Sequence, residues 1–150
     1  MTIESVCVYS GSSVHVAPLY KTAAQDVGRT LAQHKLRLIY GGGLVGLMGL
    51  TANAALNAGG EVIGIIPEHI RSHEIQHPGL TEMHVVDNMH IRKSMMAEKA
   101  DAFVALPGGF GTLDELFEIM TWKQIALHTK PILIYNVNNF WDPLLALIDH

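Results

Sequence analysis

The sequence predicts an α/β protein with a Rossmann-like, doubly wound parallel sheet in three layers. Six short runs rich in valine, isoleucine and leucine alternate with longer segments whose apolar residues recur at helical spacing. The runs are continuously apolar, which is typical of strands buried on both faces of a parallel sheet. Three of them end in turns of glycine and small hydroxyl residues, and such sheets bind ligands beyond the carboxyl ends of their strands.

Each element is predicted from its own pattern. Strands are expected at residues 5–10, 36–40, 61–67, 82–86, 102–106 and 131–136. Helices are expected at residues 17–35, 46–59, 88–100 and 112–128, with another beginning at residue 140. A chain of 150 residues fits one domain with one core, here a nucleotide-binding domain over residues 1–150. The helical pattern still runs at His150, so either the chain ends there or a last helix is missing.

Charge and apolar content indicate which classes of binding partner to expect. The formal net charge is −4 and no dense run of lysine or arginine occurs, so nucleic acid is not an expected partner. Hydrophobic residues make up 49% of the chain and charged residues only 16%, against a usual ~25%, which favours a homo-oligomer. The alternative explanation is a sheet buried on both faces, which also raises the apolar content.

The cellular location is expected to be the cytoplasm. The single cysteine, Cys7, excludes an internal disulfide framework, and the first residues carry no signal-peptide pattern. The longest apolar stretches are far shorter than the roughly 20 residues that cross a bilayer, so no membrane partner is expected.

Three turns at strand ends carry glycine or serine: "YSGSS" (9–13), "YGGGLVGLMG" (40–49) and "LPGGFGT" (106–112). All three are expected at one edge of the sheet. Glycine lets a ligand approach the main chain, and a helix that begins just after it directs free amides and partial positive charge at that ligand. The pattern therefore predicts a phosphate site.

The second turn also matches the dinucleotide pattern G-x-G-x-x-G at residues 41–46, with Glu61 twenty positions further on. Glu61 begins its strand, however, and so lies at the opposite edge of the sheet from the turn, where it cannot reach a ribose. No Lys-Ser or Lys-Thr pair follows any of the turns, so the Walker pattern is absent as well. Close packing of helix against strand explains these glycines as well as a ligand does.

The third turn has two explanations. Thr112 and Glu115 fit a capping box, in which each side chain satisfies a free amide at the start of a helix. A cap does not need the accommodating main chain of Pro107, Gly108, Gly109 and Gly111, and these residues favour a phosphate cradle.

Acidic residues follow this turn closely, at Asp114, Glu115 and Glu118. A carboxylate ~8 Å from a phosphate dianion is repelled by about 4 kcal/mol at an effective dielectric constant near 20. A cation that forms ~4 Å from the same carboxylate is stabilised by about 4 kcal/mol, or roughly three decades in rate. The arrangement suits a sugar phosphate whose anomeric carbon becomes positive, as in cleavage of a glycosyl bond.

A basic pair lies in the first turns of the helix expected at 88–100. Arg92 and Lys93 occupy a position where the helix dipole disfavours cations, and they share one face with Met89 and Met96. Arg92 is either a solvated charge beside a core stripe or a fork of donors for phosphate or ribose oxygens.

A metal site is not expected. The stretch "HEIQH" (73–77) matches the zincin pattern, but Pro78 and Gly79 follow at once in a polar connection, where no helix can hold both histidines on one face. His69, His73 and His77 are expected at the surface or in loops. Cys7 lies within a strand without an activating base, so it is not expected to be a nucleophile.

The stretches "PGGFGTLDE" (107–115), "MHIRK" (89–93) and "GGGLVGLMG" (41–49) resemble the LONELY GUY family. Its members are phosphoribohydrolases that act on cytokinin riboside 5′-monophosphates, and bacterial members were often labelled possible lysine decarboxylases. The resemblance covers essentially the whole chain, and the P-G-G-x-G-T-x-x-E signature is specific. It implies hydrolysis of the N-glycosidic bond of an N6-modified adenosine monophosphate, or of AMP itself, to free base and ribose 5-phosphate. It implies no cofactor, and a homodimer.

The resemblance also implies roles for individual residues. The essential arginine falls on Arg92 and the essential glutamate on Glu115, while the phosphate falls to Gly108, Gly109, Gly111 and Thr112. The remaining residues expected to bind substrate are Gly11, Ser12, Gly43, Met89, Lys93 and Asp114. Asp114 stands where glutamate is frequent, and the connection after Pro67 is longer than in plant members, which leaves the base preference open.

Two other functions remain as alternatives. A carrier or sensor of the same fold would bind a nucleotide without turnover. A pyridoxal phosphate decarboxylase would need a Schiff-base lysine and a pyridinium partner, and the sequence singles out neither.

Overall fold

Six parallel strands form one sheet in the computed structural model, which describes residues 2–71 and 75–150. The order across the sheet is β4-β3-β2-β1-β5-β6, and every neighbouring pair is parallel. The strands are β1 (Ser5–Tyr9), β2 (Arg37–Tyr40), β3 (Val62–Pro67), β4 (Glu82–Val86), β5 (Ala102–Ala105) and β6 (Ile132–Ile134). The helices are α1 (Pro18–Gln33), α2 (Gly46–Asn57), α3 (Glu68–Arg71), α4 (Met89–Lys99), α5 (Phe110–Gln124) and α6 (Asp142–Asp149), with a 3-10 helix η1 (Val137–Asn139).

This architecture confirms the predicted fold class. All six expected strands and all five expected helices are present, with boundaries shifted by up to four residues at helix ends. The two short elements α3 and η1 were not predicted, because four and three residues are too few to show a helical period.

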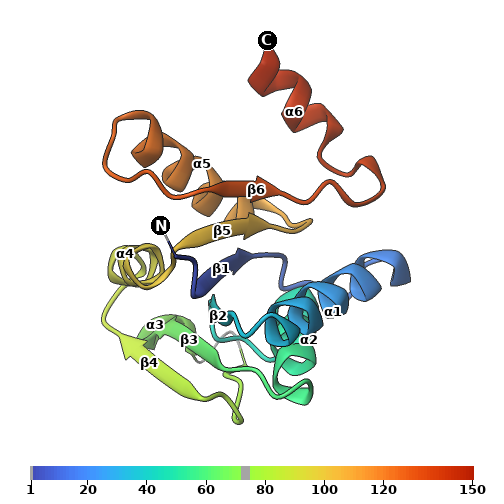
Figure 1. The fold of residues 1–150 in the computed structure, drawn as a ribbon, viewed down its shortest axis with the longest axis vertical. Coiled ribbons are helices and arrows are strands. Elements are labelled where there is room, and N and C mark those ends of the chain that lie inside the picture. The colour runs from blue at the N-terminus through green and yellow to red at the C-terminus, as the bar shows by residue number, and fades with distance from the viewer. Residues whose placement is uncertain (1, 72–74) are drawn as a thin grey trace.

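Helices cover the two faces of the sheet in separate layers, α1 and α2 on one side and α4 and α5 on the other (Figure 1). Side chains alternate along each strand, so β2 sends Leu38 and Tyr40 to the first layer and Ile39 to the second. All three are almost completely buried. The central strands therefore read as continuously apolar because both of their faces are covered.

The edge strand β6 departs from that expectation. Leu133 is 62% exposed, so part of one sheet face at β6 is uncovered. The helix α6 extends away from the sheet at this end of the molecule (Figure 1) and has no buried residue of its own.

The chain changes direction at the centre of the sheet. After β1 it builds β2, β3 and β4 to one side, and then it returns to place β5 and β6 on the other side of β1. The turns after β1 and β5 meet there, where the Gly11 amide donates a hydrogen bond to the Pro107 carbonyl at 3.2 Å. In open parallel sheets this switch point is the crevice that binds ligands.

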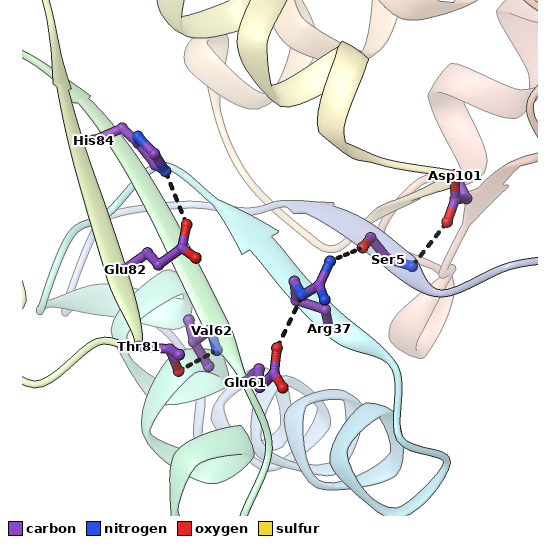
Figure 2. A network of polar contacts seen from close by, with 8 residues as sticks. All are labelled: Ser5, Arg37, Glu61, Val62, Thr81, Glu82, His84 and Asp101. Atoms are coloured by element: carbon purple, nitrogen blue, oxygen red, sulfur yellow. Dashed lines mark hydrogen bonds and ion pairs between the residues drawn. The ribbon is translucent and has the colours of Figure 1, made fainter.

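The amino ends of the strands are closed by their own polar contacts (Figure 2). Asp101 accepts hydrogen bonds from the amides of Glu4 and Ser5 at 2.8 and 3.0 Å. The Arg37 guanidinium reaches Glu61 at 3.0 Å and the Ser5 hydroxyl at 3.3 Å. This edge therefore serves the fold, and the opposite edge is left for a ligand.

Among the residues that the structure describes, no helix combines the length and apolar character needed to cross a membrane.

Candidate active site

A cavity of about 700 Å³ opens at the switch point. Its walls come from the turns after β1, β2 and β5, from α4 and α5, and from the start of α1. Of the residues predicted to form the site, the cavity is lined by Gly11, Ser12, Met89, Arg92, Gly108, Gly109, Gly111, Thr112, Asp114 and Glu115. Lys93 and Gly43 are not among its lining residues.

Three helices begin at this edge without a side-chain cap. The N-cap residues of α1, α2 and α5 are Ala17, Val45 and Gly109, and none of them makes a side-chain capping bond. None of the three helices has an acidic residue in its first turn. The Met48 amide of α2 donates to the Gly11 carbonyl at 3.4 Å, whereas residues at the starts of α1 and α5 line the cavity. The positive ends of these two helix dipoles suit the cavity to an anion.

The turn before α5 is built as a cradle, and the capping-box explanation of Thr112 is wrong. The helix begins at Phe110, two residues before Thr112, and its N-cap is Gly109. Thr112 is buried inside the first turn, and its hydroxyl fills the space that a Cβ at Gly108 would need. A Cβ at Gly109 or Gly111 would meet no atom within 4 Å, so the glycines leave open room beside the amides.

Arg92 lies at the floor of the cavity and is only 5% exposed, so it is not a solvated charge beside a core stripe. Its Nε donates to the Ile65 carbonyl at 2.9 Å and its Nη2 donates to the Gly41 carbonyl. The guanidinium thus holds the carboxyl ends of β3 and β2 together. Only glycine at position 41 permits this, because an added Cβ would overlap Nη2.

The neighbouring Lys93 is turned toward α5. Its Nζ lies 3.3 Å from Asp114 and 3.0 Å from Glu118. Burial lowers the pKa of Lys93, but the bonds to Glu118 and Asp114 outweigh it and raise the pKa overall. Lys93 therefore joins α4 to α5 and neutralises two of the three acids that follow the cradle.

Glu115 is the third of these acids, and its half-buried side chain lines the cavity. It lies in the second turn of α5, downstream of the glycine cradle. The buried Tyr9 lines the same cavity and stacks on Phe103, with 6.0 Å between ring centroids. Burial, with the nearby Cys7 and Glu115, raises the pKa of Tyr9, which keeps its hydroxyl protonated.

The glycine turn after β2 supports the site more than it lines it. Gly43 is buried, accepts a hydrogen bond from the Tyr40 hydroxyl at 2.7 Å and forms a bridge with Gln76. A Cβ at Gly46 would overlap the main chain of Ser12. Packing therefore explains these two glycines, whereas Gly41 faces the cavity.

The position of Glu61 excludes a dinucleotide site of the G-x-G-x-x-G type at residues 41–46. Glu61 directly precedes β3 at the amino edge of the sheet, where it pairs with Arg37 (Figure 2). Its carboxylate lies at the far end of the strands from the glycine turn, as the sequence indicated.

His77 lies in a loop, as expected, but it is buried rather than at the surface, with only 7% of the residue exposed. Its Nε2 lies 2.6 Å from Asn53 Oδ1, and its Nδ1 accepts a hydrogen bond from the Gly79 amide at 3.0 Å. The neutral Nε2–H tautomer satisfies both contacts. Burial lowers the pKa of His77, which favours this neutral form. His69 is exposed on α3, and His73 and Glu74 of the zincin pattern lie outside the described residues.

Cys7 is buried, and burial is the main reason that its pKa is raised. It is therefore poorly suited to act as a thiolate nucleophile, as expected.

Several lining residues were missed by the sequence reasoning. Tyr9 is the first residue of the motif "YSGSS" and His15 lies two residues after it, so both could have been found from this motif. Tyr20 and Phe140 form an edge-to-face aromatic pair at 5.7 Å at one end of the cavity. They are 120 residues apart in the sequence, and no local pattern relates them.

The fold and the cavity place the protein in the class of Rossmann-like parallel α/β proteins with a cavity at the switch point of the sheet. The family model described as "Possible lysine decarboxylase" matches residues 48–150. The chain is 51% identical over 150 residues to a cytokinin riboside 5′-monophosphate phosphoribohydrolase of Rhodococcoides fascians, covering 99% of this chain and 76% of that protein. The chain belongs to this family, the LONELY GUY family of the resemblance.

A plant relative and two solved structures complete the comparison. The phosphoribohydrolase LOG of Oryza sativa subsp. japonica is 45% identical over 144 residues, covering 96% of this chain and 60% of that protein. The Moco carrier protein of Chlamydomonas reinhardtii has a TM-score of 0.78 at 21% identity, over 99% of this chain and 85% of that one. The molybdenum cofactor binding protein of Rippkaea orientalis has a TM-score of 0.75 at 24% identity, over 99% and 85%. These structures share the fold.

Proposed function

We propose that the protein is a hydrolase that cleaves the N-glycosidic bond of adenosine 5′-monophosphate, with or without an N6 substituent. Water adds to C1′, and the products are the free base and ribose 5-phosphate. The names of the relatives, with 51% and 45% identity, support this reaction.

One observation carries the proposal: the glycine cradle, Arg92 and Glu115 all line the same cavity. The cradle offers main-chain amides and the N-terminus of α5 to the 5′-phosphate. Glu115 lies further along the same helix, where it is suited to positive charge that develops on the ribose.

The mechanism follows from these separate roles of the cradle and Glu115. As the bond from C1′ to the base breaks, the ribosyl group becomes oxocarbenium-like and its positive charge is stabilised by the Glu115 carboxylate, which also orients the attacking water. Arg92 binds and polarises the substrate from a guanidinium that two carbonyls hold in place. The attraction grows only as charge forms, so it lowers the barrier more than it strengthens ground-state binding.

Pyridoxal phosphate chemistry does not fit these residues. A decarboxylase of that type needs a lysine that forms a Schiff base with the cofactor. No lysine lines the cavity within the described part of the chain, and the nearby Lys93 points its Nζ at Asp114 and Glu118.

We further propose that the protein works in the cytoplasm as a homodimer. Support for the dimer comes from the low share of charged residues and from large exposed apolar side chains, among them Ile125, Leu127, Leu133 and Leu147.

The reaction is tested by incubating the protein with AMP, with N6-isopentenyladenosine monophosphate and with adenosine, followed by chromatography for free base. Release of base from one or both monophosphates is expected. Tight binding of a monophosphate without release of base would contradict the proposal and favour the carrier function.

A further inference from the structure

His15 lies in the turn between β1 and α1 and lines the cavity, although no motif included it. Its amide donates to the Ser13 hydroxyl oxygen at 3.2 Å, which fixes the main chain of this turn. Its imidazole is exposed, and within residues 2–71 and 75–150 it makes no hydrogen bond or ion pair. The fold therefore gives this side chain no structural task.

The turn that carries His15 is held against the phosphate cradle. The Gly11 amide donates to the Pro107 carbonyl at 3.2 Å, and a Cβ at Gly11 would lie only 3.3 Å from the Gly108 Cα. His15 follows four residues later, two positions before the uncapped N-terminus of α1. His15 lines the cavity together with Tyr20 of α1, and Arg92 of α4 lines the same cavity.

Positively charged side chains are few among the described residues that line the cavity. Asp114 and Glu115 line it, and the described lining residues that can carry positive charge are Arg92 and His15. Arg92 is bonded to carbonyls at the ends of β2 and β3, whereas the cradle follows β5. Lys93 is engaged by Asp114 and Glu118.

We propose that His15 binds the 5′-phosphate of the substrate, donating an imidazole N–H to a phosphate oxygen, and so selects phosphorylated nucleosides over free ones. This inference rests on the proposed function. A hydrogen bond to a charged oxygen is among the stronger ones in proteins.

The test uses ribose 5-phosphate and adenine as separate probes of the two halves of the substrate. The dissociation constant of ribose 5-phosphate is measured by calorimetry, and the inhibition constant of adenine is measured against AMP hydrolysis. His15→Ala is expected to weaken ribose 5-phosphate binding about tenfold and to raise the KM for AMP by a similar factor, with adenine unchanged. His15→Gln keeps an N–H donor and is expected to recover part of the loss.

The matched control is His34→Ala, an exposed histidine at the other end of α1, and it is expected to behave as wild type. Ribose 5-phosphate binding by His15→Ala within twofold of wild type would overturn the inference. An equal loss for adenine would overturn it too, because the effect would then not concern the phosphate. A wild-type protein that releases no base from any nucleoside monophosphate contradicts the proposed function, whereas hydrolysis that is indifferent to His15 contradicts only this role.

Discussion

At the scale of single residues, Arg92 joins two strand ends and lines the cavity. Its guanidinium is buried and bonds carbonyls from two neighbouring strands, so it fixes the floor of the cavity that it lines. The sequence indicated an unusual arginine among methionines, but two explanations stayed open, because spacing along a helix does not tell which strand ends face it. The structure resolves this through contacts 27 and 51 residues away in the chain.

The variant Arg92→Lys tests this residue, because an ammonium group cannot reproduce the planar fork. One carbonyl loses its partner, and we expect the free energy of unfolding to fall by about 1–3 kcal/mol. The kcat/KM for AMP should fall by about 100-fold or more, since the floor of the site shifts. Urea denaturation and steady-state kinetics measure the two effects. Arg29→Lys, in an exposed pair with Asp26, is the control and should change neither; full activity in Arg92→Lys would contradict the role.

At the scale of elements, a change at the start of α5 is expected to affect phosphate binding without lowering the stability of the fold. Gly111 lies in the first turn of the helix, and a methyl group there would meet no protein atom within 4 Å. The fold therefore does not require glycine at this position. We propose that glycine at this position leaves space for the phosphate.

We expect Gly111→Ala to be as stable as wild type or more stable by about 0.5–1 kcal/mol, since alanine favours the helix. The same methyl group should crowd the phosphate and weaken AMP binding by at least tenfold. Thermal unfolding and calorimetry measure the pair of effects. Unchanged AMP affinity would show that the cradle is not where the phosphate lies.

A second element, residues 75–79, braces the glycine turn after β2. The His77 amide donates to the Gly42 carbonyl at 2.9 Å and the Leu44 amide donates to the Ile75 carbonyl at 2.8 Å. The buried imidazole of His77 holds this segment to Asn53 of α2. Loss of the neutral imidazole should therefore loosen the turn that carries Gly41.

The direction of the pH effect follows from the pKa of His77, which burial lowers. The unfolded chain takes up a proton near pH 6.5 and the folded chain only below that, so the stability contributed by His77 is complete above about pH 6.5 and declines as the pH falls. We expect His77→Gln to lose less stability than wild type between pH 7.5 and pH 5. Urea midpoints at the two pH values measure this, and equal losses would contradict it.

The elements also show where sequence reasoning succeeds and where it stops. Continuous apolar runs and glycine turns specify the strands and the edge that binds ligands, because these signals are local. The start of α5 was placed two residues too late, since Thr112 has the chemistry of a cap and only the main-chain geometry shows that Gly109 takes that position. His77 contacts Asn53, which lies 24 residues away in the sequence, so no local pattern predicts that contact.

At the scale of the whole molecule, topology concentrates the site. The order β4-β3-β2-β1-β5-β6 brings the turns after β1 and β5 together, so residues from the first and last thirds of the chain share one cavity. The exposed side chains Leu127, Leu133 and Leu147 leave apolar surface on the β6 side of the molecule.

We expect this surface to cause self-association. Sedimentation at micromolar protein should give twice the 16.4 kDa mass of one chain. Leu133→Lys places a charge on the uncovered part of β6 and should shift the equilibrium toward the monomer. A single species of 16.4 kDa for the wild type would contradict the homodimer.

We propose that the amides of the cradle hold the phosphate, while Glu115 acts on charge that appears at C1′ during bond cleavage. Single-turnover hydrolysis of AMP by Glu115→Gln, together with the AMP dissociation constant of the same variant, tests it most directly. We expect a rate about 1000-fold below wild type. AMP should bind as tightly as before or more tightly, because a carboxylate near the phosphate is removed. A Glu115→Gln variant that keeps its rate within tenfold, or that loses rate only because it no longer binds AMP, would contradict it.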